Sequence, residues 1–163
     1  MRSIRFTMFH RFRHEARYYP TLSRVPLDVR MKLDLTGAKI SLNDWLSFSF
    51  EERIVLCHLP CASEEETGVF TSYLNFLTSK HTGKPLGMTE VLDSALWNSR
   101  DVPDEVRQKS AECDRPVDEN EWRHWDTHQR YALYKTAVSQ SQPEAFGDVL
   151  EELRRRGEFG AAK

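Results

Sequence analysis

The fold of this chain is decided by residues Val25 to Leu56, which read VPLDVRMKLDLTGAKISLNDWLSFSFEERIVL. The stretch returns once, 77 residues later and without a gap. Pro26 then falls on Pro103 and Trp45 on Trp122, and matches between such uncommon residues are hard to obtain by chance. The other identical pairs are Val25 with Val102, Val29 with Val106, Arg30 with Arg107, Lys32 with Lys109, Asn43 with Asn120, Arg53 with Arg130 and Leu56 with Leu133. This gapless match predicts an internal repeat.

Each copy is predicted to begin with a helix. Pro26 suits the first turn, where its missing N–H is no loss. Asp28 and Lys32 are spaced as an i,i+4 ion pair beside the apolar stripe, and Gly37 is expected to end the helix. The corresponding residues of the second copy are Pro103, Glu105 and Lys109.

Three further helices follow in each copy. Ser41 caps a short helix that carries Trp45, and Ser49 with Glu52 forms a capping box for the third helix. In the second copy the short helix is capped by Asp118 and the third starts at Asp126 or Thr127. The fourth helices carry apolar side chains at helical spacing, namely Phe70, Tyr73, Leu74 and Leu77, and, 76 residues later, Phe146, Val149, Leu150 and Leu153.

These signals predict an all-α fold of two pseudo-symmetric repeats, with about four helices each. Nothing in the sequence is typical of a β-strand. We expect a single helical domain over residues 18–157, with repeat one at 25–83, a connector at 84–101 and repeat two at 102–156. The charged, glycine-rich tail 157–163 is expected to be loose.

Residues 1–17 are rich in arginine and phenylalanine, and Glu15 is their only acid. Interleaved basic and aromatic residues could bind RNA or an anionic surface, and a transit peptide has a similar composition. The interpretation that we favour is a loose terminus whose later part packs on the core.

The composition bounds the class of protein. A net charge of −2 and a pI near 6.3 leave no general basic field, so nucleic-acid binding is not expected. No run approaches the roughly 20 apolar residues of a membrane span, and the first residues lack the apolar core of a secretory signal. Three cysteines do not make a disulfide framework, which favours a reducing cytoplasm. The oligomeric state is left open.

Four recurring arginines are the candidate binding residues: Arg30, Arg53, Arg107 and Arg130. An arginine fork suits carboxylate or phosphate, so these residues could form a partner surface or a two-fold anion site. The anion site would lie near Arg30 and Arg107. A structural alternative, which we favour, pairs Arg53 with Asp44 inside the first repeat. The same alternative pairs Arg130 with Glu121 in the second.

Two groupings have metal-ligand residues, but the sequence favours a structural role for both. CHLPC at 57–61, with Cys113, offers only one close ligand pair, whereas structural zinc sites normally show two. His124 and His128 are spaced i,i+4, but a helix start at Asp126 would separate them. We therefore expect no metal site, no cofactor, and cysteines that are buried and inert.

No catalytic motif is present. The chain lacks a nucleophile elbow, a P-loop, a dinucleotide fingerprint and an HExxH sequence. None of its acids stands in an apolar setting that would raise a pKa for general acid work. The sequence therefore predicts a protein that is not an enzyme.

Several segments carry a resemblance to a known family: RVPLDVRMKLD at 24–34, LNDWLSFSFEER at 42–53, LPC at 59–61, FRHEA at 12–16 and VPDEVRQK at 102–109. They resemble the nitrate reductase associated protein family, which comprises small bacterial proteins well represented in cyanobacteria. The resemblance runs from about residue 12 to residue 156 and is thinner over the connector.

The resemblance implies an accessory role in nitrate assimilation. The expected partner is assimilatory nitrate reductase or the molybdenum-cofactor machinery, and the role would concern activity, maturation or cofactor loading. The resemblance supplies no catalytic residues. The alternative from the residues alone is a small-molecule or anion sensor, with its ligand between the two repeats.

Overall fold

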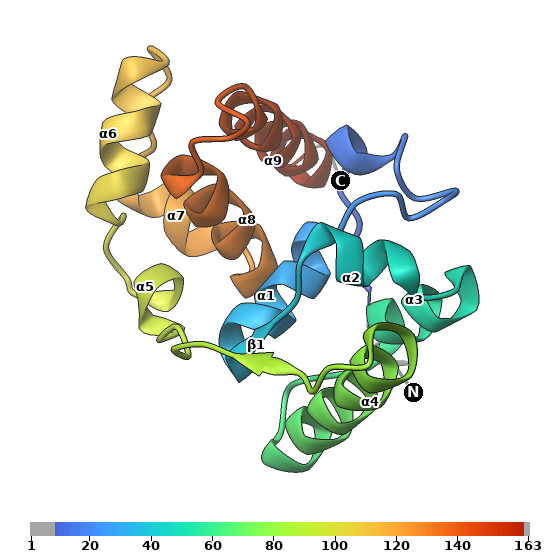
Figure 1. The fold of residues 1–163 in the computed structure, drawn as a ribbon. Coiled ribbons are helices and arrows are strands. Elements are labelled where there is room, and N and C mark those ends of the chain that lie inside the picture. The colour runs from blue at the N-terminus through green and yellow to red at the C-terminus, as the bar shows by residue number, and fades with distance from the viewer. Residues whose placement is uncertain (1–8, 162–163) are drawn as a thin grey trace, which may run out of the picture. The chain divides into compact units, whose positions relative to one another are not determined.

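The computed structural model describes the backbone of residues 9–161 and the side chains of residues 9–156. Over these residues the chain is mostly helical, so the prediction of a helical fold is confirmed (Figure 1). The expectation that no strand is present is wrong in one detail. A two-stranded antiparallel ladder pairs Ala38 with Met88 and Lys39 with Gly87.

The chain forms two compact units. Of the described residues, the first unit contains 9–11 and 15–92, and the second contains 12–14 and 93–161. The elements of the first unit are α1 (Leu27–Thr36), β1 (Ala38–Lys39), α2 (Leu42–Ser47), α3 (Phe50–His58), α4 (Glu64–Thr82) and β2 (Gly87–Met88). Those of the second are α5 (Ala95–Asn98), α6 (Asp104–Glu112), α7 (Glu119–His124), α8 (Thr127–Val138) and α9 (Ala145–Ala161). A 3-10 turn spans Arg13–Glu15.

The helix starts lie where capping chemistry predicts them. Ser41, Ser49 and Ser63 each close a capping box at the start of α2, α3 and α4. Asp118 accepts a hydrogen bond from the backbone N–H of Glu121 and so caps α7. These side chains satisfy N–H groups that have no partner within the helix.

Each unit is built around a buried tryptophan from its short helix. Trp45 is fully buried, and its indole N–H donates to the carbonyl of Leu22 at 2.7 Å. Trp122 is equally buried, and its indole N–H donates to the carbonyl of Ser99 at 3.0 Å. Both the tryptophans and their acceptors lie 77 residues apart, as do the starts of α1 and α6, α2 and α7, and α3 and α8.

The segment 84–101 contains more structure than its sequence indicates. It holds β2 and the four-residue helix α5, whose Trp97 is 1% exposed. The Trp97 ring packs edge-on against Tyr131 of α8, with 5.0 Å between ring centroids. A helix of four residues is too short to show a periodic pattern, so the sequence could not reveal it.

The N-terminal segment contributes buried side chains where it is described. Phe9 belongs to the core of the first unit and Phe12, 2% exposed, to the second unit. The backbone N–H of Arg13 donates to the Glu152 carboxylate of α9, also in the second unit. Residues 1–8, which include Arg2, Arg5 and Phe6 of the basic and aromatic pattern, lie outside the described residues, as do the side chains of the 157–163 tail.

Two glycines end helices in the left-handed conformation, and they provide a matched test of the first unit. Gly37 has φ 75° and Gly83 has φ 71°. A Cβ on Gly37 would lie 2.7 Å from the carbonyl oxygen of Thr89, whereas one on Gly83 would meet open space. We expect Gly37→Ala to lower the free energy of unfolding by about 2 kcal/mol, because the clash adds to the left-handed strain, and Gly83→Ala by about 1 kcal/mol. Urea denaturation of both variants measures the difference, and equal losses would contradict the clash.

Candidate functional site

The two arginines of the first unit are bound to backbone carbonyls. The Nε of Arg30 donates to the carbonyl of Val25 at 3.1 Å. Arg53 donates to the carbonyl of Phe48 through Nε and Nη2, at 3.2 and 3.0 Å, and through Nη1 to the carbonyls of Thr21 and Leu22. The predicted pair with Asp44 is wrong, because the Asp44 carboxylate accepts the Ser41 N–H in the capping box of α2. Arg53 therefore links the backbone between α2 and α3 to the segment at Thr21 and Leu22.

The arginines of the second unit differ from this arrangement. Arg107 forms an exposed ion pair with Glu119 at 2.8 Å, and Arg130 donates to the side chain of Asn98 at 3.2 Å. The predicted pair of Arg130 with Glu121 is also wrong, because Arg154 of α9 binds both Glu121 oxygens, at 2.8 and 3.1 Å. A role for these four arginines as a ligand or partner surface stays a prediction.

A buried ion pair lies in the first unit. Asp28 and Lys32 are 2% and 4% exposed, and Lys32 Nζ lies 3.3 Å from Asp28 Oδ2. The same Nζ donates to the carbonyl of Cys57 at 2.7 Å, near the end of α3. Burial raises the pKa of Asp28, and the charge of Lys32 opposes that rise. The i,i+4 pairing predicted from the sequence is thus confirmed, whereas no ion pair joins Glu105 and Lys109 in the structure.

Glu15 is a second buried acid of the first unit. It is 8% exposed, and its carboxylate accepts hydrogen bonds from the Tyr19 hydroxyl at 2.9 Å and the Leu27 N–H at 3.0 Å. Burial raises the pKa of Glu15 to about 7, although these hydrogen bonds and the charge of Arg30 oppose the rise. The expectation that no acid has an elevated pKa is therefore wrong. The burial of Glu15 could not be predicted from the sequence, because its neighbours along the chain are mostly polar or basic and its buried surroundings form only in the folded unit.

The cysteines are free thiols in three different environments. Cys57 is buried, Cys61 is half-buried and Cys113 is exposed. Burial raises the pKa of Cys57 to about 12 and that of Cys61 to about 11. The expectation of burial is therefore confirmed for Cys57 and wrong for the exposed Cys113, and the inertness of the thiols stays a prediction.

This difference predicts one reactive thiol. Because the thiolate is the nucleophile, we expect Ellman's reagent at pH 8 to modify Cys113 at least about 100-fold faster than Cys57 or Cys61. The measurement is the time course of absorbance in folded protein, and Cys113→Ser should abolish the fast phase. A fast phase that survives in Cys113→Ser would contradict the assignment.

The histidine pair 124 and 128 is divided as predicted. His124 ends α7, and its Nδ1 donates to the carbonyl of Asn120 at 2.6 Å, while His128 lies on α8. Among the residues that the structure describes, no group of three or more histidine, cysteine or acidic side chains could hold a metal ion. In the same part of the chain, no helix is long and apolar enough to cross a membrane.

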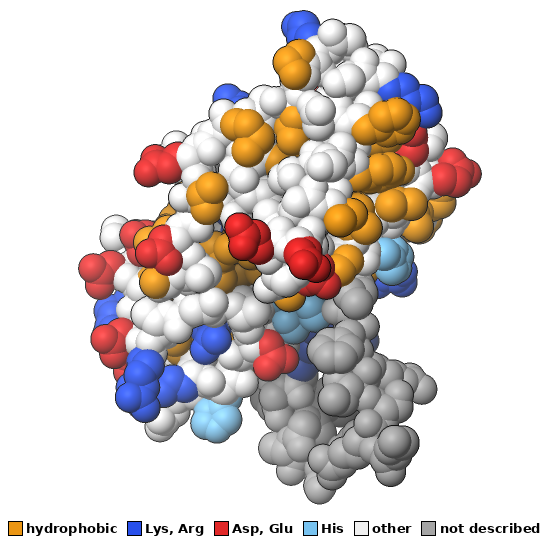
Figure 2. Space-filling view, turned by 90° about the horizontal axis from the view of Figure 1, so that it is seen from below, with side chains coloured by type: hydrophobic (Ala, Val, Ile, Leu, Met, Phe, Trp, Pro, Cys, Tyr) orange, Lys and Arg blue, Asp and Glu red, His pale blue; other side chains and the backbone are white. Residues whose placement is uncertain are grey.

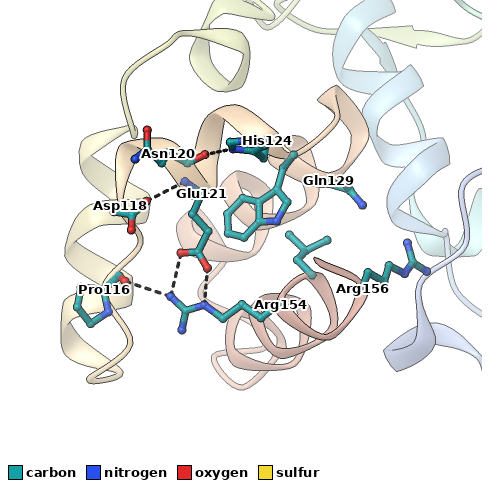
Figure 3. A pocket seen from close by; sticks show the side chains of 10 residues that line it. Pro116, Asp118, Asn120, Glu121, His124, Gln129, Arg154 and Arg156 are labelled. Atoms are coloured by element: carbon teal, nitrogen blue, oxygen red, sulfur yellow. Dashed lines mark hydrogen bonds and ion pairs between the residues drawn. The ribbon is translucent and has the colours of Figure 1, made fainter. Parts of the chain in front are cut away.

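The second unit contains a pocket of about 770 Å³, lined by residues of α7, α8 and α9 (Figure 3). Trp125 and Leu153, both buried, are apolar residues of its lining. Glu121 and Arg154 form one wall, and Arg154 also donates to the carbonyl of Pro116 at 3.1 Å. The hydrogen bonds to Glu121 raise the pKa of Arg154, so this wall is a charged, paired group. His124, Gln129 and Arg156 complete the polar lining.

The first unit exposes large hydrophobic side chains on α2, α3 and α4. We call the following five residues the apolar face: Leu42, Leu46, Phe50, Val69 and Phe76, which are 40–58% exposed. The two leucines are four residues apart on α2, the α4 pair is seven apart, and α2 packs on α4. Figure 2 shows hydrophobic side chains gathered on part of the viewed surface. Exposed hydrophobic residues that lie together are more often part of an interaction surface than single exposed hydrophobic residues are.

Comparison with known proteins assigns the family but no detailed function. No curated protein and no solved structure matches the chain. The sequence profile described as conserved nitrate reductase-associated protein matches residues 11–153, which is most of the chain and includes both compact units. The description names an association with nitrate reductase. The chain therefore belongs to the family of conserved nitrate reductase-associated proteins.

Proposed function

We propose that this chain is a non-enzymatic accessory protein of nitrate assimilation, which binds nitrate reductase through the apolar face of its first unit. The observation that carries the proposal is that face, in a member of a family described by its association with the reductase. The contact would assist the activity or maturation of the assimilatory enzyme in the cytoplasm, directly or together with the molybdenum-cofactor machinery.

The corresponding residues of the second unit support the choice of the apolar face as the binding surface. We infer that the two units are copies of one helical unit, since the starts of three helices keep the offset of 77. At the positions of Leu42, Leu46 and Phe50 the second unit has Glu119, Arg123 and Thr127. At the positions of Val69 and Phe76, shifted by 76, it has Ala145 and Glu152. The second unit exposes other hydrophobic residues, among them Leu96 and Val138, but at the positions of the apolar face it has mostly polar residues.

The energetics suit a partner contact. Covering a large apolar side chain that is half exposed contributes on the order of 1 kcal/mol, so five such residues could anchor an interface. A chain without the apolar face would keep its fold, because exposed positions contribute little to the free energy of unfolding.

Affinity purification from nitrate-grown cells tests the proposal. A tagged wild-type chain is expected to recover nitrate reductase or a cofactor-synthesis protein, identified by mass spectrometry, and a Leu46→Arg/Phe76→Glu chain is expected to lose it. Both changes introduce residue types that the second unit carries at the same positions. Val138→Arg is the matched control, because Val138 is a 42% exposed hydrophobic residue of the second unit. Recovery of neither protein by the wild-type chain would contradict the proposal.

A further inference from the structure

The apolar face of the first unit continues into an acidic side chain at the start of α4. Val69 and Phe76 lie on one side of this helix, because they are seven residues apart. Glu65 lies four residues before Val69 and therefore on the same side. All three side chains are exposed. An approaching partner thus meets two hydrophobic groups and then a carboxylate along one helix.

A second exposed acid lies near the other end of α4. Glu52, in the first turn of α3, binds Lys80 and His81 in the last turn of α4, at 3.1 and 2.7 Å. The start of α3 is therefore next to the end of α4. It carries the exposed Phe50 of the apolar face, followed directly by the exposed Glu51. Carboxylates thus lie near both ends of α4.

These two acids are not engaged within the unit. In the part of the chain that the structure describes, neither Glu51 nor Glu65 forms an ion pair or a side-chain hydrogen bond. Residues 42–82 contain six acids and only two basic residues, Arg53 and Lys80. Arg53 donates to backbone carbonyls, and Lys80 is paired with Glu52. The surroundings of the apolar face are therefore negative.

The acids differ between the two predicted copies together with the hydrophobic residues. At the position of Glu51 the second copy has His128, and at the position of Glu65, shifted by 76, it has Ser141. The first unit thus combines exposed hydrophobic residues and exposed acids at positions where the second copy has neither. This joint difference favours one surface with an apolar centre and acidic ends.

We propose that the apolar face binds a short basic amphipathic helix of the partner protein, with lysine or arginine residues that contact Glu51 and Glu65. This inference rests on the proposed function, since it names the kind of segment that the partner carries. A helix presents hydrophobic side chains on one side at the four-residue interval found on α2 and α4. Eleven residues separate Glu65 from Phe76, or roughly 17 Å, so a helix of about three turns spans this length.

The charges disfavour two other occupants. A second copy of the same face would place another set of the same acids at the interface, and like charges brought together there cost free energy. An anionic lipid surface would be repelled by the same carboxylates. A basic segment is attracted instead, and its attraction should weaken as the salt concentration rises.

Calorimetry of the full chain with three synthetic peptides tests the proposal. The first is a leucine–lysine peptide of about 14 residues with its leucines on one side of a helix. The other two carry glutamine or glutamate in place of every lysine. At low salt, we expect the lysine peptide to bind at least tenfold more tightly than the glutamine peptide, and the glutamate peptide to bind more weakly still.

Variants of the chain locate the binding. Glu51→Gln/Glu65→Gln should weaken binding of the lysine peptide at least fivefold. Glu105→Gln/Glu112→Gln, the matched control, removes two exposed acids of the second unit and should stay within twofold of wild type. Glu105 is the second residue of α6, as Glu65 is of α4, so the control also covers the loss of an acid from a first helical turn. Melting temperatures confirm that each variant is folded.

Leu46→Arg/Phe76→Glu should weaken binding of the lysine peptide at least tenfold. No binding of the lysine peptide, or equal binding by wild type and Glu51→Gln/Glu65→Gln, would overturn the proposal. So would a dimer in sedimentation that Leu46→Arg/Phe76→Glu dissociates, because the occupant would then be a second copy. These outcomes leave the proposed contact with nitrate reductase to its own test, since that contact requires the apolar face and not the acids.

Discussion

Lys32→Ala is expected to lower the free energy of unfolding by about 3–5 kcal/mol, whereas Lys109→Ala lowers it by less than about 0.5 kcal/mol. The two lysines occupy the same position in the first helix of each unit, yet Lys32 is 4% exposed and Lys109 is more accessible. Without Lys32, Asp28 is left as a buried charge, and the carbonyl of Cys57 loses its donor. Lys109 makes no such contacts.

Urea denaturation at pH 7 measures both variants. Lys32→Met is a further control, because it keeps the volume and removes only the charge and the donors. It should remain destabilised, which separates the buried-charge effect from a cavity effect. Similar losses in Lys32→Ala and Lys109→Ala would contradict the structural difference between the two pairs.

Glu15 is expected to make the first unit less stable as the pH rises. Its carboxyl has a pKa of about 7 in the folded chain and an ordinary value of 4.5. An acid whose folded pKa is raised contributes stability that is fully present below pH 4.5 and is lost as the pH rises to 7. The difference corresponds to about 3 kcal/mol. Asp28, whose pKa is also raised, changes stability in the same direction.

Denaturation midpoints between pH 4.5 and 8 test this expectation. The wild-type chain should lose stability over this range, and Glu15→Gln should flatten most of the dependence, because glutamine does not ionise. Its amide oxygen can accept from the Leu27 N–H, and its NH2 group can donate to the Tyr19 hydroxyl oxygen. A wild-type chain that gains stability from pH 5 to 7, with Glu15→Gln parallel to it, would show that Glu15 is ionised at little cost.

Local signals predicted the helices well, because capping and periodicity act over a few residues. Ser41, Ser49 and Ser63 start helices as expected, and Gly37 and Gly83 end them in the left-handed conformation. The apolar spacing of α9 correctly placed Phe146, Val149, Leu150 and Leu153 in the core. Such features need no knowledge of tertiary contacts.

Side-chain partners were predicted less well, because they depend on segments far away in sequence. Arg53 was expected to bind the nearby Asp44, but it binds the carbonyls of Thr21 and Leu22, some thirty residues earlier. Glu121 was expected to bind Arg130, but α9 brings Arg154 to it. Neither of these contacts can be predicted from the residues next to the arginine in the sequence.

The candidate sites were missed for a different reason. The positions that are identical in the two predicted copies include the buried Trp45 and Trp122, but also the exposed Arg107. The apolar face lies instead at positions where the predicted copies differ, such as Leu46 against Arg123. Identity between copies therefore does not indicate a surface that is present in the first unit only.

The most direct test of the proposed function is the affinity of the purified chain for purified nitrate reductase, measured by calorimetry. Wild-type chain and Val138→Arg are expected to bind within twofold of each other, and Leu46→Arg/Phe76→Glu at least tenfold more weakly, which is about 1.4 kcal/mol. The double variant must show an unchanged melting temperature. Equal affinities for the wild-type chain and Leu46→Arg/Phe76→Glu, or no binding by the wild-type chain, would contradict the account.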